Sequence, residues 1–226
     1  MSPPLDDAPA GSARNITGLI LAGGRGARMD ERDKGLLEWR GRPLIAHVRE
    51  RLAPQVDGVL VSANRNLDRY ADYGDVVRDD AQFGAWQGPL AGVAAGIAAC
   101  RTPWLAVVPC DTPCLPADLV ARLSDGAAAA GAPLAVACAG GRRHSVCMLL
   151  RVSLLPGLLA YLRGGARRVD TWQGLAGGVE VGFARAEGFY NINTPDQLVH
   201  TERDSESLPD PHTQGPGAGG RGPGGV

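Results

Sequence analysis

The sequence has 226 residues, 44% of them hydrophobic, which is enough to bury the core of one domain or of a small pair of domains. Its 23 Lys and Arg residues nearly balance its 24 Asp and Glu residues, so no overall charge attracts nucleic acid or an anionic membrane, and any anion binding must be local. The five cysteines are odd in number and follow no zinc-finger or CxxC spacing, which argues against a disulfide framework and indicates reduced thiols.

The two ends of the chain differ in composition from the rest. Residues 1–15 are rich in Pro, Ala, Ser and Asp, and the chain ends in GPGAGGRGPGGV. Such segments bury too little apolar surface to offset their ordering entropy, so we expect disorder at 1–15 and 204–226 and one domain over 16–203. There is no apolar leader after a basic region and no run of about 18 apolar residues. We therefore expect a cytoplasmic protein that binds neither membrane nor nucleic acid.

Strands and helices alternate along the expected domain. In chain order, the patterns predict a strand at 16–22, a helix at 43–52, strands at 58–63 and 76–77, a helix at 89–99, a strand at 104–108, a helix opened by Pro116, strands at 133–139 and 145–150, and helices at 153–163 and 196–200. Pro43 fits the first position of its helix. The continuous apolar run 104–108 is typical of a strand covered on both faces. The alternation predicts an α/β protein with a doubly wound, mostly parallel sheet.

The first predicted strand runs into a glycine-rich, highly charged stretch, LILAGGRGARMDERDKG at residues 19–35. Loops at the carboxyl ends of strands in such sheets bind ligands. Glycines let backbone N–H groups approach an anion, and Arg25, Arg28 and Lys34 add positive charge. A dinucleotide-binding fingerprint is excluded because Met29 stands where it needs glycine, and a Walker loop because Gly35 follows the lysine. A solvated glycine-rich turn is the alternative.

Several further motifs follow in order. They read GRPLIAHV (41–48), SANR (62–65), GPLAG (88–92), PCDTP (109–113), RRV (167–169) and NINTP (191–195). Together with L-A-G-G-x-x-x-R-M and D-K-G, this set resembles the molybdenum cofactor guanylyltransferases over residues 16–201. The resemblance implies a Rossmann-like, three-layer nucleotidyltransferase fold. It also implies Mg²⁺-dependent transfer of GMP from GTP to the phosphate of molybdenum-molybdopterin, which yields the guanine dinucleotide cofactor and pyrophosphate.

Asp111 follows the apolar strand 104–108 at its carboxyl end, beside the glycine-rich loop, where a carboxylate can hold a hard cation. The resemblance implies that Asp111 is the Mg²⁺ ligand; a helix cap or a turn is the alternative. The resemblance also implies that Arg28 and Lys34 are catalytic residues that clamp the triphosphate or the incoming phosphate. The alternative for both is solvated surface charge.

The nucleotide is expected to lie against the backbone of Leu21, Ala22, Gly23 and Gly24. Related cytidylyltransferases read L-A-A-G, so Gly23 is the expected purine discriminator. Further expected nucleotide contacts are Lys34, Ser62, Asp79 and Asp111. Ser62 stands where the family usually has Asn, and Asn64 follows it. Asp79 follows the third strand at its carboxyl end, where a carboxylate can accept hydrogen bonds from guanine or ribose; its neighbour Asp80 is the alternative.

For the pterin substrate, the resemblance points to Arg28, Arg168, Asn191 and Asn193. Turn formation before Pro195 is the alternative for the two asparagines, and surface charge for Arg168 and its neighbour Arg167. Cys110 and Cys114 with His144 lack the spacing of a metal site, so we expect two buried small side chains and a structural histidine.

Three rival functions remain open from the sequence. They are a cytidylyltransferase for the same pterin, a nucleotidyltransferase for another phosphorylated metabolite, and a non-catalytic protein that binds nucleotide or hands over the cofactor. The expected partners are GTP and molybdenum-molybdopterin. Molybdenum-insertion proteins and recipient molybdoenzymes or their chaperones are further candidates.

Overall fold

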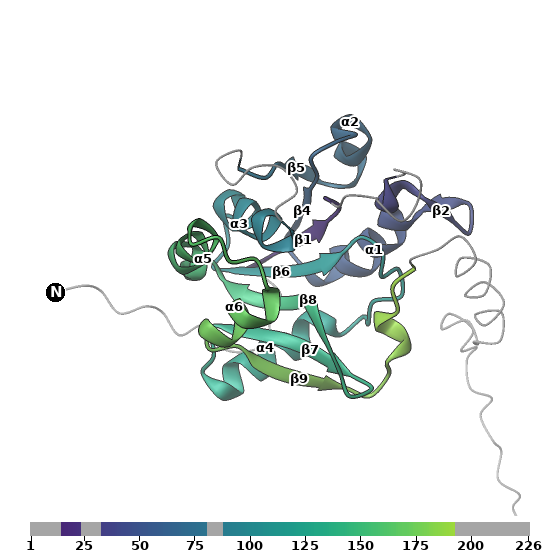
Figure 1. Cartoon of the computed structure of the whole chain (residues 1–226). Coiled ribbons are helices and arrows are strands. Elements are labelled where there is room, and N and C mark those ends of the chain that lie inside the picture. The colour runs from purple at the N-terminus through teal and green to yellow at the C-terminus, as the bar shows by residue number, and fades with distance from the viewer. Residues whose placement is uncertain (1–14, 24–32, 81–87, 193–226) are drawn as a thin grey trace, which may run out of the picture. The chain divides into compact units, whose positions relative to one another are not determined.

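A computed structural model describes residues 15–23, 33–80 and 88–192. These residues form a seven-stranded sheet of order β5-β4-β1-β6-β8-β7-β9 and a small two-stranded sheet (Figure 1). The strands are β1 (Ile16–Leu21), β2 (Glu38–Trp39), β3 (Arg42–Pro43), β4 (Gly58–Ser62), β5 (Asp75–Val77), β6 (Trp104–Pro109), β7 (Leu134–Ala139), β8 (Arg142–Arg151) and β9 (Val179–Phe183). The helices are α1 (Leu44–Leu52), α2 (Leu67–Tyr70), α3 (Pro89–Ala99), α4 (Leu119–Ala130), α5 (Leu155–Arg163) and α6 (Val169–Leu175).

The large sheet is mostly parallel, as predicted. β5, β4, β1 and β6 run in one direction, and β7 is parallel to β9. Only β8 among the described strands of this sheet runs against its neighbours, β6 and β7. The predicted strand 145–150 is therefore the antiparallel member of the sheet.

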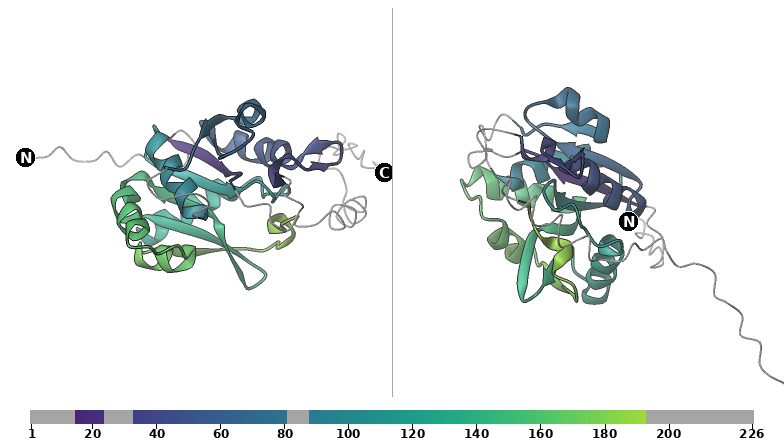
Figure 2. Two further views of the ribbon diagram at one scale, coloured as in Figure 1. Left: turned by 45° about the horizontal axis from the view of Figure 1, so that its top comes forward. Right: turned by 90° about the vertical axis from the view of Figure 1, so that its right-hand side faces the viewer.

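Helices cover both faces of the sheet (Figures 1 and 2). On one face, residues of α1 and α4 pack on the sheet in a cluster that includes Ile45, Val48 and Leu123. On the other face, residues of α3, α5 and α6 form a second cluster, with Val93, Leu158 and Trp172 buried. The result is the expected three-layer α/β architecture.

The small-residue helix α3 packs tightly on the sheet, as predicted. A Cβ atom at Gly96 would lie 2.5 Å from Leu19 Cδ2, and one at Gly92 would lie 2.5 Å from Ser62 Oγ. Both distances are too short for a real contact, so these glycines permit the close approach of α3 to β1 and β4.

Several elements differ from their predicted bounds. The helix expected from Pro116 begins at Leu119, because the Leu119 amide closes a turn onto the Pro116 carbonyl (3.2 Å). Pro43 ends β3 in an extended conformation, with ψ of 144°, and lies just outside α1. Five of the described strands and helices were not predicted from the sequence: β2, β3, α2, α6 and β9.

Other expectations fall on residues that the structure does not describe. The predicted helix 196–200 and most of the two expected disordered ends lie outside the described residues, so these stay predictions. In the described part of the chain, no helix is both long and apolar enough to cross a bilayer.

Candidate active site

The carboxyl ends of four parallel strands define the candidate site. β1 lies between β4 and β6, with Leu21 opposite Ser62 on one side and Pro109 on the other. Beyond these ends, the Ala22 amide donates to the Ser62 carbonyl (2.8 Å) and the Cys110 amide donates to the Leu21 carbonyl (3.1 Å). The direction in which successive strands are added to the sheet reverses at β1. β4 and β5 lie on one side of β1, and the next strand of the sheet, β6, lies on the other side. Ligands of open α/β sheets bind at such a point.

Lys34 and Asp111 form an ion pair at this edge, in which Lys34 Nζ donates to Asp111 Oδ2. The Asp111 residue is only 8% exposed. Its second oxygen, Oδ1, is buried and has no hydrogen-bond partner among the described residues. Because a buried charged oxygen is costly unless it is paired, Asp111 Oδ1 is a position for a ligand donor or a cation.

A magnesium ion fits this oxygen. Mg²⁺ is commonly held by one or two carboxylates, with waters and substrate phosphates filling its other positions. The described residues contain no group of three or more His, Cys, Asp or Glu side chains placed to hold a metal ion. Asp111 therefore fits a metal that is shared with a phosphate ligand better than one enclosed by protein ligands.

Lys34 is chemically distinct from every other basic side chain in the sequence. Of the 23 basic residues, 22 are arginine and one is lysine. A lysine ammonium is a compact charge with three rotatable donors, whereas a guanidinium is a planar fork. A single ammonium at position 34 can therefore contact the Asp111 carboxylate and a phosphate oxygen together.

Asp33 anchors the chain immediately before Lys34. Its buried carboxylate accepts a hydrogen bond from Tyr70 Oη and another from Asn66 Nδ2 (2.9 Å), and it pairs with Arg65 Nε (3.2 Å). All three donors belong to residues 65–70, which include α2. The D-K-G motif contains Asp33, but no spacing in the sequence pointed to these partners. The position of Lys34 thus depends on a segment more than thirty residues away.

Gly35, on the other side of Lys34, permits a close backbone approach. A Cβ atom there would lie 2.7 Å from Tyr70 Oη and 3.3 Å from Cys110 Sγ. Tyr70 is fully buried; burial, followed by the nearby Cys110 thiol and the Asp33 hydrogen bond, raises the pKa of the Tyr70 phenol. The hydroxyl therefore keeps its proton and serves as a donor to Asp33.

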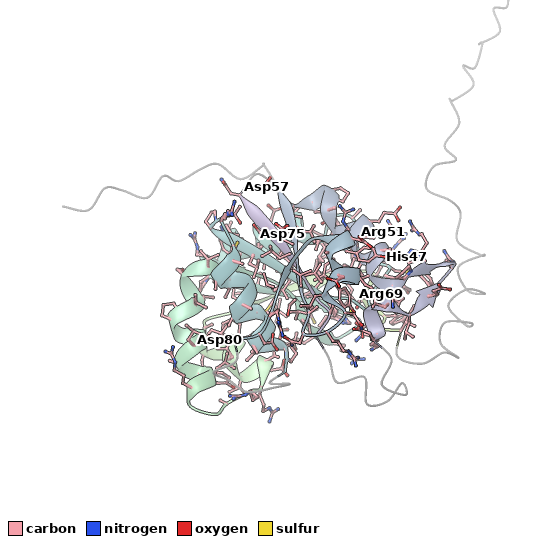
Figure 3. The ribbon with its side chains drawn as sticks, turned by 90° about the horizontal axis from the view of Figure 1, so that it is seen from above. His47, Arg51, Asp57, Arg69, Asp75 and Asp80 are labelled. Carbon is pink, nitrogen blue, oxygen red and sulfur yellow. The ribbon has the colours of Figure 1, made fainter. Side chains whose placement is uncertain are left out.

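Ser62 and Asp79 lie at the ends of β4 and β5. The Ser62 side chain is buried against α3, at Gly92, and its carbonyl accepts the Ala22 amide. Asp79 is half-buried and bonded to Asn64. In Figure 3, Asp75 lies at the start of β5, and the exposed Asp80 lies beyond the opposite end of that strand. Asn64 also lies beside Gly23, so the structure brings Asp79 to the same edge as Gly23.

Asn191 and Ile192, the last described residues of the chain, lie beside Asp111. The Ile192 amide donates to the Asp111 carbonyl (2.9 Å), and Thr112 Oγ1 donates to Asn191 Oδ1 (2.9 Å). Asn191, expected to contact the pterin, therefore lies beside the proposed metal ligand. Its exposed neighbour Tyr190 was not singled out from the sequence.

Arg168 lies just before α6 and is exposed. Its carbonyl accepts hydrogen bonds from the Trp172 amide (3.2 Å) and from Tyr161 Oη (3.0 Å). The neighbouring Arg167 instead donates to the Leu162 carbonyl (2.7 Å). Arg167 thus supports the turn before α6.

Three predicted site residues, Gly24, Arg28 and Asn193, lie outside the described residues, and their roles stay predictions. The expectation for the cysteines is half right. Cys110 is buried but Cys114 is exposed, because Cys114 follows the end of β6 in a turn. His144 stacks on Phe189, with ring centroids 4.6 Å apart, which agrees with a packing role.

Residues 18–177 match the family model for the MobA-like NTP transferase domain. The chain is 48% identical over 189 residues to a molybdenum cofactor guanylyltransferase of Cupriavidus taiwanensis, which covers 81% of this chain and 94% of the relative. It is 46% identical over 205 residues to the protein of the same name from Burkholderia ambifaria, which covers 86% of this chain and 98% of the relative.

Other solved structures share the fold, including the following two. One is molybdopterin-guanine dinucleotide biosynthesis protein A from Archaeoglobus fulgidus, with a TM-score of 0.69 and 20% identity, covering 85% of this chain and all of that one. The other is 2-C-methyl-D-erythritol 4-phosphate cytidylyltransferase from Thermus thermophilus, with a TM-score of 0.60 and 19% identity, covering 83% of this chain and 98% of that one.

Proposed function

This chain belongs to the family of MobA-like NTP transferases, and we propose that it transfers GMP from GTP to the phosphate of molybdenum-molybdopterin. The terminal phosphate of the pterin attacks the α-phosphorus of GTP. A bond forms between that phosphate oxygen and the α-phosphorus, the bond to the bridging oxygen of the β-phosphate breaks, and pyrophosphate leaves. The product is the molybdopterin guanine dinucleotide cofactor.

The observation that carries the proposal is the Lys34–Asp111 pair at the shared end of β1 and β6. It combines a positive charge for the triphosphate with a buried carboxylate oxygen that has no partner in the described part of the chain. Phosphoryl-type transfer depends chiefly on positioning and charge neutralisation. A phosphate monoester is largely ionised at neutral pH, so the nucleophile needs little help from a general base.

Asp111 holds Mg²⁺ in this proposal. The bound ion would neutralise developing charge and help pyrophosphate leave. Lys34 orients Asp111 Oδ2 and contributes positive charge to the phosphates, while Asp33, held by Tyr70 and Asn66, keeps the backbone at Lys34 in place. Arg28 supplies a second cation to the phosphates in the proposed complex.

Guanine binds beside Gly23 and Asp79, and the pterin binds on the other side of Asp111. Asn191, bonded to Thr112, offers its amide to the pterin phosphate, together with Asn193 and Arg168. The backbone of Leu21, Ala22, Gly23 and Gly24 lies against the nucleotide. Ser62 contributes through its carbonyl, which holds the Ala22 amide, because its hydroxyl is covered by α3.

We also propose that the reaction takes place in the cytoplasm. All five cysteines are free thiols, which is typical of proteins from a reducing compartment. Molybdenum-insertion proteins are the proposed source of the pterin substrate, and recipient molybdoenzymes or their chaperones are the proposed acceptors of the product.

Pyrophosphate release from the purified protein with Mg²⁺, molybdopterin, and either GTP or CTP tests the proposal. We expect turnover with GTP at least about tenfold faster than with CTP. Equal turnover with both nucleotides would contradict the assignment of guanine. Turnover with neither, despite nucleotide binding, would instead support a non-catalytic role in cofactor handover.

A further inference from the structure

The side chain of Asn64 clamps Asp79. Asn64 Nδ2 donates to Asp79 Oδ2 (2.8 Å), and the Asp79 amide donates to Asn64 Oδ1 (3.1 Å). Each bond requires a different end of the side-chain amide, so the two together fix its orientation. Asn64 lies two residues beyond the end of β4, which pairs in parallel with β5. One side chain thus holds both the carboxylate and the backbone of the residue at the neighbouring strand end.

The clamp leaves one oxygen of Asp79 available. Asp79 Oδ1 is buried and has no hydrogen-bond partner among the described residues. Burial raises the pKa of this carboxyl, and the hydrogen bond from Asn64 opposes that rise. A buried acceptor without a partner is costly. This oxygen is therefore suited to accept a hydrogen bond that a bound ligand donates.

Gly23 borders the same clamp. A Cβ atom at Gly23 would lie 3.3 Å from Asn64 Nδ2, the atom that holds Asp79, and 3.8 Å from the Ser62 carbonyl. The first distance is tighter than an ordinary contact, so Asn64 would have to move by a few tenths of an ångström. A methyl group at position 23 thus points at the residue that orients Asp79.

We propose that Asn64 is a positioning residue that presents the Asp79 carboxylate to the donor edge of the base, and that the residue at position 23 affects base selectivity through Asn64. The inference deepens the proposed function and rests on it. Guanine offers adjacent N1–H and N2–H₂ donors, which can bond to Asp79 Oδ1 and to the second lone pair of Oδ2, whose first accepts from Asn64. Inosine lacks the 2-amino group, and cytosine offers only its N4 amino group. If Asp79 is displaced, the preference of the protein for GTP over ITP and CTP should therefore fall.

The first test compares GTP with ITP as substrates of the wild-type protein and of Asn64→Ala. We expect Asn64→Ala to raise the KM for GTP about tenfold while kcat changes less than about threefold, and to reduce the preference for GTP over ITP by a similar factor. The isosteric Asn64→Asp loses the donor and faces Asp79 with a like charge, so the preference of this variant for GTP over ITP should fall further than that of Asn64→Ala. Asn15→Ala, at an exposed asparagine, is the matched control and should match the wild type.

The preference for GTP over ITP is a ratio within one protein sample, so partial unfolding of a variant does not change it. An unchanged ratio in Asn64→Ala would overturn the positioning role.

The second test is a double-mutant cycle between positions 23 and 64. Gly23→Ala should lower the GTP-to-CTP preference by about tenfold in the wild-type background and by less than about twofold when Asn64 is already alanine. An equal effect in both backgrounds would overturn the route through Asn64 and indicate direct contact of residue 23 with the base.

Equilibrium binding of GTP and ITP without the pterin separates this inference from the proposed function. If the wild type binds GTP but does not transfer GMP, the proposed function fails, and the binding ratios still decide the role of Asn64. If GMP transfer occurs normally and the binding ratio is insensitive to Asn64→Ala, the inference fails alone.

Discussion

Lys34 and Asp111 are 77 residues apart in the sequence and form an ion pair at the shared end of β1 and β6. The pair joins the end of the glycine-rich stretch 19–35 to the strand end that carries the proposed metal ligand. One oxygen of Asp111 is thereby occupied, and the other is left without a partner among the described residues. Substitutions at both positions test what each member contributes.

Replacement of Asp111 by asparagine removes the charge that would hold Mg²⁺. We expect Asp111→Asn to lower kcat by roughly 100-fold or more, while nucleotide binding without metal largely survives. The control is Asp125→Asn, at an exposed carboxylate of α4, which should leave kcat unchanged. Steady-state pyrophosphate release and nucleotide titration in EDTA measure the two quantities. Near-normal turnover of Asp111→Asn would remove the metal role.

Amine-directed chemistry can address Lys34 as the one lysine side chain, because the sequence contains no other lysine. We expect reductive methylation or acetylation to modify only Lys34 and the N-terminal amine, to inactivate the enzyme, and to be slowed by GTP with Mg²⁺. Lys34→Arg keeps the charge but has no amine, so its residual activity should resist the reagent. Loss of activity to the same extent in Lys34→Arg would show that modification of the N-terminus is responsible.

The hydroxyl of Tyr70 stabilises the fold through Asp33. Tyr70→Phe removes one donor from a buried carboxylate, and we expect the free energy of unfolding to fall by about 1–3 kcal/mol. Tyr73→Phe, three residues later and half-buried, is the control and should change it by less than about 0.5 kcal/mol. Urea denaturation measures both. Equal effects would mean that the Asp33 contact adds no stability.

Gly35 and Tyr70 should be energetically coupled, because a Cβ atom at Gly35 would meet Tyr70 Oη at 2.7 Å. We expect Gly35→Ala alone to destabilise the protein by about 1–3 kcal/mol, and to cost less in the Tyr70→Phe background, where the clashing oxygen is absent. The same denaturation experiment on the double variant checks this. Strictly additive effects would contradict the crowding.

His47 makes stability depend on pH. Its Nε2 donates to the Trp39 carbonyl (2.8 Å), and its Nδ1 faces Arg42 Nη2 at 3.2 Å. Burial, aided by the Arg42 charge, lowers the pKa of His47, although the Trp39 bond and Glu50 oppose the shift. Below a pH of about 6.5 the unfolded chain therefore binds more protons at this site than the folded one, so stability falls as pH falls.

We expect His47→Gln to lose less stability than the wild type between about pH 7 and about pH 5. Above that range, the two stability curves should run parallel. Urea denaturation at a series of pH values measures this. Parallel curves throughout the acid range would show that His47 does not contribute.

The parts of the fold that the sequence predicts well are those with strong local patterns. The continuous apolar runs of β1 and β6 are buried on both faces, and Asp111 follows β6 as expected. β9 was missed although its alternation, VEVGF, has the period of a strand with one exposed face. Glycines at positions 177, 178 and 182 masked that signal.

The contacts that orient the site could not be predicted in the same way. The hydrogen bond from Tyr70 to Asp33 spans 37 residues, and the clamp of Asn64 on Asp79 depends on how β4 and β5 align. A single side-chain bond between distant residues leaves no periodicity in a sequence. Motifs therefore located Lys34 and Asp111, and the end of the third predicted strand located Asp79, whereas the residues that hold these three side chains required the three-dimensional structure.

The most direct measurement of the central claim follows the phosphorus atoms of GTP. The protein is incubated with Mg²⁺, molybdenum-molybdopterin and GTP labelled at either the α- or the γ-phosphorus, and the products are separated. The account predicts that the α-label appears in the pterin dinucleotide and the γ-label in pyrophosphate, in equal amounts. Release of the γ-label as inorganic phosphate, or of the α-label as free GMP, without a labelled pterin product would contradict it.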